Sequence, residues 1–446
     1  MDKKVSIIGG GITGLTIAFY LKKAGIPFHI FEKEKRIGGV IKTQEKDGFL
    51  FEKGPNSGVL SNIEVIFLIE DLNLENKLEI ADTTAKKRLI WKKEKWHALP
   101  AGILSAVNTP LFTLQDKFRV LGEPFRKKGN KPDETLAEMV KRRLGKSFLD
   151  YAIDPFISGI YAGNPNYLVP KYALPKLYNL EQEYGSFIKG AIAKKKLPKT
   201  DDDKKVTKEI FSFKGGLETL VKTLEQRIGQ ENISLNSSNL AISKKGNNYL
   251  INNREFTDVI STVNAQNLSK IFSFISPEEI SAIGNLQYAN VIELNIGFNK
   301  WQGMDIQAFG GLVPMKEKKN ILGALFMSST FSERAPKGGA LFTLFAGGTQ
   351  RTDIPKKNDD EIKKIVAEDF QTMMGLNKFT PDLFELTRYP IAIAQYGKDS
   401  KNRLENISQI EQKHRGIHLA GSIRDGVGLA DRVKQATELA KKIIEE

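Results

Sequence analysis

The chain has 446 residues, so we expect two or three lobes rather than a single core. Its hydrophobic content of 40% and charged content of 27% are typical of a globular protein, and no apolar run approaches the roughly 18 residues of a membrane-spanning helix. The absence of cysteine excludes disulfides, a Cys-x-x-Cys redox pair and cysteine-bound metal. The net charge of +14 is compatible with nucleic acid, an anionic membrane or an acidic ligand, and also with a lysine-rich solvated surface.

A nucleotide-binding turn opens the chain. An apolar strand expected at 5–8 is followed by a Gly-x-Gly-x-x-Gly turn and a helix expected over 15–24. Gly9 permits the tight turn, Gly11 lets the backbone approach a pyrophosphate, and Gly14 lets helix and strand pack closely. The unpaired N–H groups and the dipole at the helix start favour phosphate, so the spacing predicts dinucleotide binding. Because the strand begins near Lys4, we expect no removable signal. A cytoplasmic location is expected because it fits the absence of cysteine.

An acid and a second pair of glycines follow. The strand expected at 28–31 ends in a carboxylate that can accept hydrogen bonds from a ribose diol, and an Arg-x-Gly-Gly turn comes next. The alternative interpretation of this turn is a basic surface loop with incidental glycines. The residues assigned to the cofactor in this segment are Glu32, Lys33, Arg36, Gly38 and Gly39.

Later segments return to the same lobe. A strand, a Gly-Gly turn and a helix running to about Ile228 are predicted from Phe211 onward, and further strands at 233–235, 240–242 and 257–262. Near the C-terminus, a strand and a glycine turn precede the last helix, which repeats a phosphate- or carbonyl-binding geometry. The residues expected to close the cofactor site there are Gly421, Val427, Gly428 and Leu429.

Two insertions lie between these segments. Residues 84–205 are rich in helical patterns, which Pro155, Pro165, Pro170 and Pro175 interrupt. Apolar residues alternate in strands at 291–296, 322–326 and 341–345. This alternation predicts a sheet with one packed face and one face that lines a cavity.

The Arg-x-Gly-Gly extension resembles the FAD fingerprint of the amine oxidase and protoporphyrinogen oxidase superfamily. In that superfamily the turn lies against the FAD pyrophosphate, and the closing glycine motif lies over the isoalloxazine ring. Stretches similar to protoporphyrinogen oxidases occur along nearly the whole chain, at residues 52–57, 88–91, 97–102, 154–164, 310–314 and 331–336.

The resemblance implies an α/β fold in which a Rossmann-type FAD-binding domain is interleaved with a mixed-sheet substrate domain and a mainly helical membrane-docking domain. The implied FAD-binding domain is discontinuous, at 1–83, 206–280 and 400–446. The implied substrate domain comprises 84–98 and 281–399, and the helical domain 99–205. The helical domain would form an entrance channel and dock peripherally on the inner face of an anionic membrane.

The same resemblance implies site residues. An arginine pairs with a propionate of a tetrapyrrole, because a guanidinium fork suits a carboxylate. Apolar side chains sandwich the macrocycle, and an asparagine and a backbone carbonyl lie near the flavin and the pyrrole N–H groups. The substrate-binding residues so implied are Arg88, Asn56, Gly159, Leu312, Leu325 and Phe345, and Gly54 joins the cofactor set.

The predicted chemistry needs little acid–base help. The chain has four histidines, none in a triad or metal-ligand pattern, and no pair of carboxylates stands out, so we expect no catalytic acid–base residue and no metal. The resemblance implies non-covalent FAD whose N5 takes hydride from a porphyrinogen in successive two-electron steps, with dioxygen or another carrier as final acceptor.

Several alternatives remain open at this point. The first predicted substrate is protoporphyrinogen IX, and coproporphyrinogen III is the nearest alternative. Another FAD enzyme of the same fold, acting on amines, amino acids, carotenoids or nucleotide sugars, and a non-catalytic flavoprotein are the others. No nucleic acid partner is expected, because no nucleic-acid-binding signature is visible, and a homodimer is left open.

Overall fold

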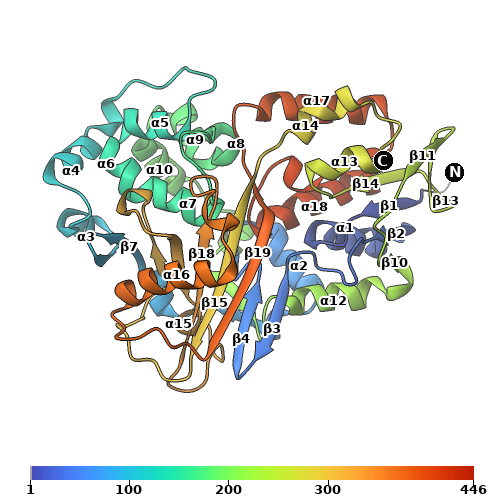
Figure 1. Cartoon of the computed structure of the whole chain (residues 1–446). Helices are drawn as coiled ribbons and strands as arrows, with labels where there is room; N and C mark the ends of the chain where they lie inside the picture. The colour runs from blue at the N-terminus through green and yellow to red at the C-terminus, as the bar shows by residue number, and fades with distance from the viewer. Residues whose placement is uncertain (1–2) are drawn as a thin grey trace.

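The computed structural model describes residues 3–446 and arranges them in three regions (Figure 1). A parallel sheet with its helices lies at one end, a large mixed sheet in the middle, and a cluster of helices at the other end. The predicted α/β class, with a Rossmann-type sheet, a mixed sheet and a helical part, is confirmed.

The first region is a five-stranded parallel sheet assembled from three distant parts of the chain. Its strands, in spatial order, are β10 (Ile233–Ser234), β2 (Phe28–Phe31), β1 (Val5–Ile8), β14 (Asp258–Ser261) and β20 (Ile417–Leu419). The main helices of this region are α1 (Ile12–Lys23), α2 (Ile63–Asp71), α12 (Glu218–Ile228) and α18 (Leu429–Glu445). The predicted start of the first helix at Leu15 is wrong: α1 begins at Ile12, because Gly11 is already the extended residue that precedes a helix.

Three smaller sheets accompany the parallel sheet, and the last of them lies at the outer end of this region, beside the N-terminus (Figure 1). They consist of the hairpin β3 (Lys42–Lys46) and β4 (Phe49–Lys53), the sheet β5 (Gly58–Val59), β9 (Ile210–Phe213) and β6 (Leu78–Ile80), and the sheet β11 (Ile242–Lys245), β12 (Asn248–Ile251) and β13 (Arg254–Phe256). The strand predicted at 240–242 therefore starts only at its last residue.

The second region is a seven-stranded mixed sheet. Its strands, in spatial order, are β19 (Leu383–Ala394), β15 (Tyr288–Phe298), β18 (Ala340–Gly347), β17 (Ile321–Phe326), β16 (Gly310–Leu312), β7 (Arg88–Lys92) and β8 (Lys95–Ala98). The segment 88–98, which lies at the start of the helix-rich stretch of sequence, thus adds two strands to this sheet.

One face of the mixed sheet is tightly packed. Alternate strand residues such as Phe342, Leu344 and Ile292 are fully buried against α16 (Asp359–Met374), which crosses the sheet (Figure 1). Because strand side chains alternate between faces, the residues in between belong to the opposite face. The prediction of a sheet with one packed face is therefore confirmed.

The third region is a cluster of mostly short helices. They are α3 (Ile103–Asn108), α4 (Leu114–Leu121), the 3₁₀ turn η3 (Glu123–Phe125), α5 (Leu136–Arg143), α6 (Lys146–Phe148), α7 (Asp154–Tyr161), α8 (Pro170–Ala173), α9 (Pro175–Tyr184), α10 (Phe187–Lys196) and α11 (Asp201–Lys205). Pro170 and Pro175 begin helices, where a missing N–H costs nothing. The prediction that Pro155 interrupts a helix is wrong. A π-helical turn at Leu149–Ile153 joins α6 to α7, and Pro155 lies in the first turn of α7.

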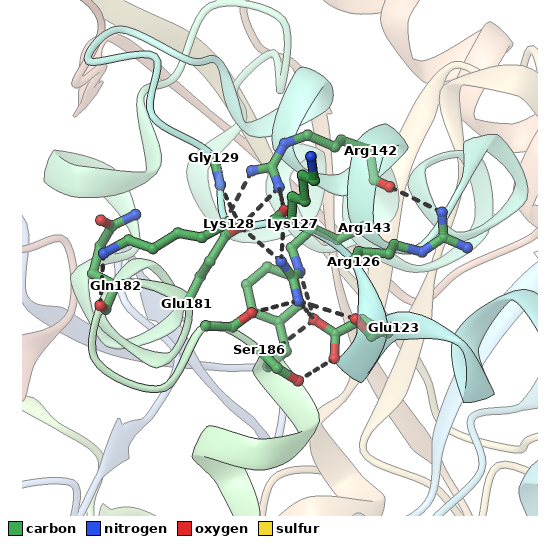
Figure 2. A network of polar contacts seen from close by, with 12 residues as sticks. Glu123, Arg126, Lys127, Lys128, Gly129, Arg142, Arg143, Glu181, Gln182 and Ser186 are labelled. Carbon is green, nitrogen blue, oxygen red and sulfur yellow. Dashed lines mark hydrogen bonds and ion pairs between the residues drawn. The ribbon is translucent and has the colours of Figure 1, made fainter.

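A buried charge network holds the helical region together (Figure 2). Arg143 at the end of α5 is fully buried and forms ion pairs with Glu123 and with Glu181 of α9. Glu123 also accepts hydrogen bonds from the hydroxyl of Ser186 and the N–H of Phe187 at the start of α10. We call Glu123, Arg142, Arg143, Glu181 and Ser186 the arginine cluster, since each carboxylate in it has a cationic partner.

The remaining helices cover the parallel sheet and the junction with the mixed sheet. They are α13 (Leu268–Ile271), α14 (Pro277–Gly284), α15 (Met327–Thr330) and α17 (Ser400–Lys413). Within residues 3–446, none of the helices combines the length and the apolar character required to cross a bilayer.

Candidate functional site

The first glycine turn leaves room for a ligand beside the backbone. Gly9 has φ +107°, and a Cβ atom there would lie 2.5 Å from the hydroxyl oxygen of Thr262, while a Cβ on Gly14 would collide with the carbonyl of Gly9. At Gly11, by contrast, a Cβ would meet no atom of the described residues within 4 Å, and none of their side chains caps the N-terminus of α1. The free N–H groups and the open position fit a pyrophosphate, as predicted from the motif.

The carboxylate of Glu32 fixes the loops on either side of it. Its Oε2 accepts a hydrogen bond of 2.6 Å from the N–H of Gly10, and its Oε1 accepts one of 2.9 Å from the N–H of Glu34. Glu32 is buried, whereas the ammonium group of Lys33 is exposed and, within residues 3–446, pairs only with Glu34, at 3.4 Å. The assignment of Glu32 to a ribose and of Lys33 to the cofactor site stays a prediction.

The second glycine turn lies directly on the first. Arg36 donates hydrogen bonds to the carbonyl oxygens of Ile37, Gly39 and Ile41, at 2.8, 2.6 and 3.0 Å, so its guanidinium group shapes the Gly38-Gly39 turn. A Cβ atom on Gly39 would lie 3.2 Å from the Cα of Gly11. The first and the second glycine turn thus both border the open position beside Gly11.

The chain then leads from the glycine turns toward the mixed sheet. A Cβ on Gly54 would collide with the carbonyl of Val40, the residue after the second turn, and the side chain of Val40 is 57% exposed. An exposed valine beside the glycine turns is an apolar surface that a bound cofactor can cover. The segment from Gly54 to Asn56 is therefore the junction between the cofactor turns and the sheet.

The C-terminal glycine motif begins at Gly421, which lies next to the first glycine turn. A Cβ on Gly421 would lie 3.0 Å from the carbonyl oxygen of Thr262, whose hydroxyl donates to the carbonyl of Ile8 beside the first turn. The N–H groups of Val427 and Gly428 donate to the carboxylate of Asp431, at 3.3 and 3.2 Å. Leu429 begins α18 and is buried in the apolar core of the parallel sheet region.

The open face of the mixed sheet collects the predicted substrate residues. Register places Arg88, Gly310, Leu325 and Thr343 opposite one another on neighbouring strands, and it does the same for Leu312, Gly323, Phe345 and Glu293. The two rows lie two residues apart on each strand, so all of them share the face opposite α16. We call this the substrate face.

The apolar residues of the substrate face are only half covered. Leu312, Leu325 and Phe345 are partly exposed, although their strand neighbours on the packed face are fully buried. A Cβ on Gly159 would collide with the side chain of Leu312, so α7 crosses the substrate face at close range. The structure therefore places Gly159 against Leu312 on this face, and the substrate-binding roles of these residues stay predictions.

Arg88 stands at the edge of the substrate face. It is the first residue of β7 and is exposed, and among residues 3–446 no carboxylate pairs with its guanidinium group. A guanidinium group without a partner is suited to bind a ligand carboxylate in two parallel hydrogen bonds.

A buried polar network lies beneath the junction, and the sequence did not single it out. Glu293 accepts hydrogen bonds from the N–H of Gly54 at 2.7 Å and from the amide nitrogen of Asn56 at 3.0 Å. The hydroxyl of Thr343 lies 2.7 Å from the amide oxygens of both Asn56 and Asn295. The amide nitrogen of Asn295 donates to the backbone carbonyl of Glu52 at 2.9 Å. We call Glu52, Asn56, Glu293, Asn295 and Thr343 the carboxyl cluster.

The two acids of this cluster have no cationic partner among the described residues. Burial raises the pKa of Glu293 to about 8 and the pKa of Glu52 to about 7, and the carboxyl group of Glu52 also acts to raise the pKa of Glu293. A sequence signal was available: polar residues at 293 and 295 interrupt an otherwise apolar strand at a spacing of two. That spacing places both on the substrate face.

Three comparisons agree with this arrangement. Two stacked glycine turns, a nucleotide-binding sheet and a half-covered apolar sheet face together define a flavoprotein of the dinucleotide-binding type. The family described as flavin containing amine oxidoreductase matches residues 12–440, and the chain belongs to this family. Its cofactor is accordingly FAD, and the open position at Gly11 fits the pyrophosphate of that molecule.

Two relatives and one solved structure are similar along nearly the whole chain. The chain is 29% identical to protoporphyrinogen oxidase 2 of Arabidopsis thaliana, over 99% of this chain and 94% of that one. It is 28% identical to coproporphyrinogen III oxidase of Bacillus subtilis, over 97% and 96%. The crystal structure of a protein from Exiguobacterium sp. 255-15, titled a putative protoporphyrinogen oxidase, covers 100% of this chain and 99% of that one with a TM-score of 0.84 and 24% identity, which shows a shared fold.

Proposed function

We propose that this flavoprotein oxidises a porphyrinogen to a porphyrin, with protoporphyrinogen IX as the first substrate. The observation that carries the proposal is the similarity, from one end of the chain to the other, to enzymes named for both protoporphyrinogen and coproporphyrinogen. The substrate face agrees with it, since it offers apolar surface, a free arginine and access to the cofactor turns.

The residues of the substrate face have distinct roles in this proposal. The guanidinium group of Arg88 binds a propionate of the substrate and fixes its orientation. Leu312, Leu325 and Phe345 contact the macrocycle and exclude water from it. The backbone carbonyl of Gly159 accepts a hydrogen bond from a pyrrole N–H, and Asn56 holds the junction next to the cofactor.

The proposed oxidation requires few further contributions from the protein. The bound flavin supplies a two-electron acceptor for a substrate C–H bond. The methylene bridges of a porphyrinogen are flanked by electron-rich pyrroles, so orientation and a dry surface are the main contributions of the chain. This agrees with a substrate face on which apolar residues outnumber ionisable ones.

Anaerobic mixing with substrate tests the proposal directly. The purified yellow protein is mixed with protoporphyrinogen IX or coproporphyrinogen III, and the visible absorption of the flavin is followed. Rapid bleaching by either compound is the expected result, and no bleaching by both compounds would overturn the proposal. Amines and carotenoid precursors, the substrates of other enzymes with this fold, serve as the comparison.

Coproporphyrinogen III is the second candidate because a relative named for it is almost equally similar. It has four carboxylates where protoporphyrinogen has two, so it needs more cations around the site. The same experiment separates the two candidates by the faster rate of bleaching. Re-oxidation of the bleached protein by dioxygen, followed with an oxygen electrode, tests dioxygen as the final acceptor.

We also propose peripheral docking of the helical region on an anionic membrane. The helices α3 and α4 lie at the outer end of this region (Figure 1). Large apolar side chains of α3, α4 and η3 are strongly exposed. They are Leu104 (81%), Val107 (58%), Leu114 (70%), Phe118 (70%), Leu121 (68%) and Phe125 (87%). Several large exposed apolar side chains on neighbouring elements are typical of an interaction site.

A basic hollow adjoins these apolar residues and supports an anionic partner. The hollow has a volume of ≈ 930 Å³, and Phe118 lies in its lining. The charged residues of the lining are Arg119, Arg126, Lys141, Lys146 and Lys316, which outnumber the two carboxylates, Asp116 and Asp150. Within residues 3–446, none of its two arginines and Lys141 pairs with a carboxylate; Arg119 and Arg126 donate only to backbone carbonyls. Docking predicts co-sedimentation with anionic vesicles that salt weakens and that neutral vesicles do not support. Equal binding to neutral vesicles, or none to anionic ones at low salt, would contradict it.

A further inference from the structure

The basic hollow of the helical region holds positive charge that its own carboxylates do not neutralise. Asp150 in its lining pairs with Lys146 at 2.6 Å and with Lys316 at 3.1 Å. Asp116, the other acid of the lining, accepts hydrogen bonds from the N–H and the hydroxyl of Thr113 and so caps the start of α4. Within residues 3–446, the remaining cations of the lining have no ion pair; they are Arg119, Arg126 and Lys141.

Backbone contacts hold the two arginines in the lining. Nη2 of Arg119 donates to the carbonyl of Lys141 at 3.1 Å. A Cβ atom on Gly145, which has φ +97°, would lie 2.6 Å from Cδ and Nε of Arg119, so the arginine crosses this turn only because the turn is a glycine. Nη2 of Arg126 donates to the carbonyl of Arg119 at 3.3 Å. A guanidinium group has five N–H donors, and these contacts occupy few of them.

Arg126 lies beside the arginine cluster but takes no part in its ion pairs. Its guanidinium group extends away from the buried carboxylates of that cluster and donates from Nη1 to the carbonyl of Arg142, at 3.5 Å (Figure 2). Its Nε is buried, and no atom of the described residues accepts a hydrogen bond from it. Burial, together with Arg119 and Arg143, acts to lower the pKa of this guanidinium group. An anion in the hollow would relieve the repulsion and supply the missing acceptor.

An uncovered apolar stripe runs along α4 beside the hollow. Leu114, Phe118 and Leu121 are 70%, 70% and 68% exposed. They follow one another at spacings of four and three residues, so they share one face of the helix. We call these three residues the apolar stripe. Phe118 belongs both to this stripe and to the lining of the hollow, so unpaired positive charge and open hydrocarbon surface meet there.

A molecule that matches both features has an anionic head and a hydrocarbon chain. We propose that the basic hollow is a binding site for one anionic phospholipid, whose phosphate group is held by Arg119, Arg126 and Lys141 and whose acyl chain lies on the apolar stripe. Guanidinium groups bind phosphate oxygens in paired hydrogen bonds, and an ammonium group adds a compact charge. The inference rests on the membrane docking proposed above, and it names a defined site for one lipid on the docking surface.

A defined site differs measurably from attraction to a charged surface. Diffuse attraction depends on the net charge of the whole face, so each exposed lysine of the region contributes to a similar extent, and the attraction requires a membrane. A site is saturated by one lipid molecule, depends on particular cations and needs no bilayer. A lipid with short acyl chains, which stays monomeric in water, separates the two cases.

The test titrates the FAD-bound protein with short-chain lipid by calorimetry. The probe is dihexanoyl-phosphatidylglycerol below its critical micelle concentration. We expect one molecule to bind per protein, about tenfold or more tightly than dihexanoyl-phosphatidylcholine, whose choline cation offsets the charge of the phosphate. Glycerol 3-phosphate, which has the phosphate group but no acyl chain, should also bind about tenfold or more weakly than the lipid.

Substitutions in the lining locate the site. Arg119→Gln and Arg126→Gln should each weaken binding of the lipid about tenfold, because each removes charge-assisted hydrogen bonds to the phosphate. Lys141→Gln should weaken it too, and it keeps the test decisive if an arginine variant does not fold, since the ammonium group of Lys141 has no hydrogen bond or ion pair within residues 3–446. Lys195→Gln on α10 is the matched control, because Lys195 is exposed and lies outside the lining, and it should leave binding unchanged.

A substitution in the apolar stripe tests the position of the acyl chain. Phe118→Ser should weaken binding of dihexanoyl-phosphatidylglycerol but leave binding of glycerol 3-phosphate unchanged, since it removes apolar area and no charge. Lipid binding equal to that of the wild type would overturn the placement of the chain on the stripe.

The remaining outcomes decide the inference. Absence of saturable lipid binding, or equal losses in Lys195→Gln and in the variants of the lining, overturns the site. Equal affinity for glycerol 3-phosphate and for the lipid would make the hollow a site for soluble phosphates and overturn the lipid as its ligand. Each of these results leaves docking on anionic vesicles by diffuse charge standing, whereas an intact lipid titration without vesicle binding would contradict the docking alone, so the two proposals fail separately.

Discussion

The arginine cluster and the carboxyl cluster are both buried, but they differ in whether their carboxyl groups form ion pairs. In the first, Arg143 is enclosed by Glu123 and Glu181, and each carboxylate has a cation and further donors. In the second, Glu52 and Glu293 share a buried environment with amides and a hydroxyl and no ion pair among the described residues. Complete pairing fixes one arrangement, whereas incomplete pairing leaves a group whose charge can change near neutral pH.

The pKa values express this difference. In the arginine cluster burial acts to raise the pKa of Glu123, but hydrogen bonds from Ser186, the N–H of Phe187 and Arg143 prevail and lower it. In the carboxyl cluster burial prevails and the pKa of both acids rises. Burial alone therefore does not tell a structural acid from one that responds to pH; the available donors and cations decide.

The largest expected effect comes from breaking the arginine cluster. Arg143→Ala leaves Glu123 and Glu181 buried without their fully buried cation, and we expect a loss of about 3–5 kcal/mol in the free energy of unfolding of the helical region. Denaturant unfolding followed by hydrogen exchange in α5, α9 and α10 measures it. Arg142→Ala is the control, since Arg142 is 30% exposed and should cost less. A loss below about 1 kcal/mol for Arg143→Ala would contradict the structural role of the cluster.

The second effect is a pair of opposite pH dependences. Glu123 and Glu181 have lowered pKa values, so their contribution to stability is complete above the ordinary value of 4.5 and is lost as the pH falls below it. Glu52 and Glu293 keep their protons up to about pH 7 and 8 in the native state but lose them near 4.5 when unfolded, so stability falls as the pH rises between these values.

Hydrogen exchange resolves the two regions in one protein. After correction for intrinsic exchange, the amides of β4 and β15 should become more protected as the pH is lowered from 8 to 5. The amides of α5 and α9 should lose protection only when the pH falls below about 4.5. Glu293→Gln should reduce the change at β15 and leave that at α5 as it is. Parallel pH profiles in both regions would show that the two clusters do not differ in this way.

A smaller effect separates the substrate face from both clusters. Arg88→Ala removes a charge-assisted hydrogen bond worth about 1.5–3 kcal/mol, which corresponds to a rise in KM for a porphyrinogen of roughly tenfold or more. FAD content and stability should not change, because Arg88 is exposed and has no ion pair with another residue of the range 3–446. Lys87→Ala, the exposed neighbour, is the matched control. Unchanged kinetics in Arg88→Ala would remove Arg88 from the site.

The smallest effect on stability is expected on the outside of the helical region. Phe118 is 70% exposed, so Phe118→Ser should change the free energy of unfolding by less than about 0.5 kcal/mol. Binding to anionic vesicles should nevertheless fall, because the variant removes apolar area from the proposed docking surface. Undiminished vesicle binding in this variant and in Phe125→Ser would exclude that surface.

Local patterns predicted the cofactor side of the molecule well. The turns around Gly11 and Gly39 follow from short motifs whose geometry depends on a few neighbouring residues, and the structure brings them together. Strand predictions in the mixed sheet were confirmed for the same reason, since alternation is a local property. Pro155 misled the prediction, because a π-helical turn before it accommodates the missing N–H.

Local sequence patterns could not predict the arginine cluster or the carboxyl cluster. Glu293 and Asn56 are separated by 237 positions, and Arg143 and Glu181 by 38, so no local pattern pairs them. Only the register of β15 shows that the polar residues of an apolar strand meet the turn after β4. The roles proposed for Arg88, Leu312, Leu325 and Phe345 stay predictions, although the structure places them on one face.

The order of strands in the parallel sheet has a consequence during synthesis on the ribosome. β20, at residues 417–419, pairs with β14, and α18 follows it, so the FAD-binding sheet is complete only when almost the whole chain has emerged. The helices from α3 to α10 come from one continuous stretch and carry their own buried cluster, so they can fold much earlier. Nascent chains should thus acquire the exposed apolar side chains of α3 and α4 before they can hold a flavin.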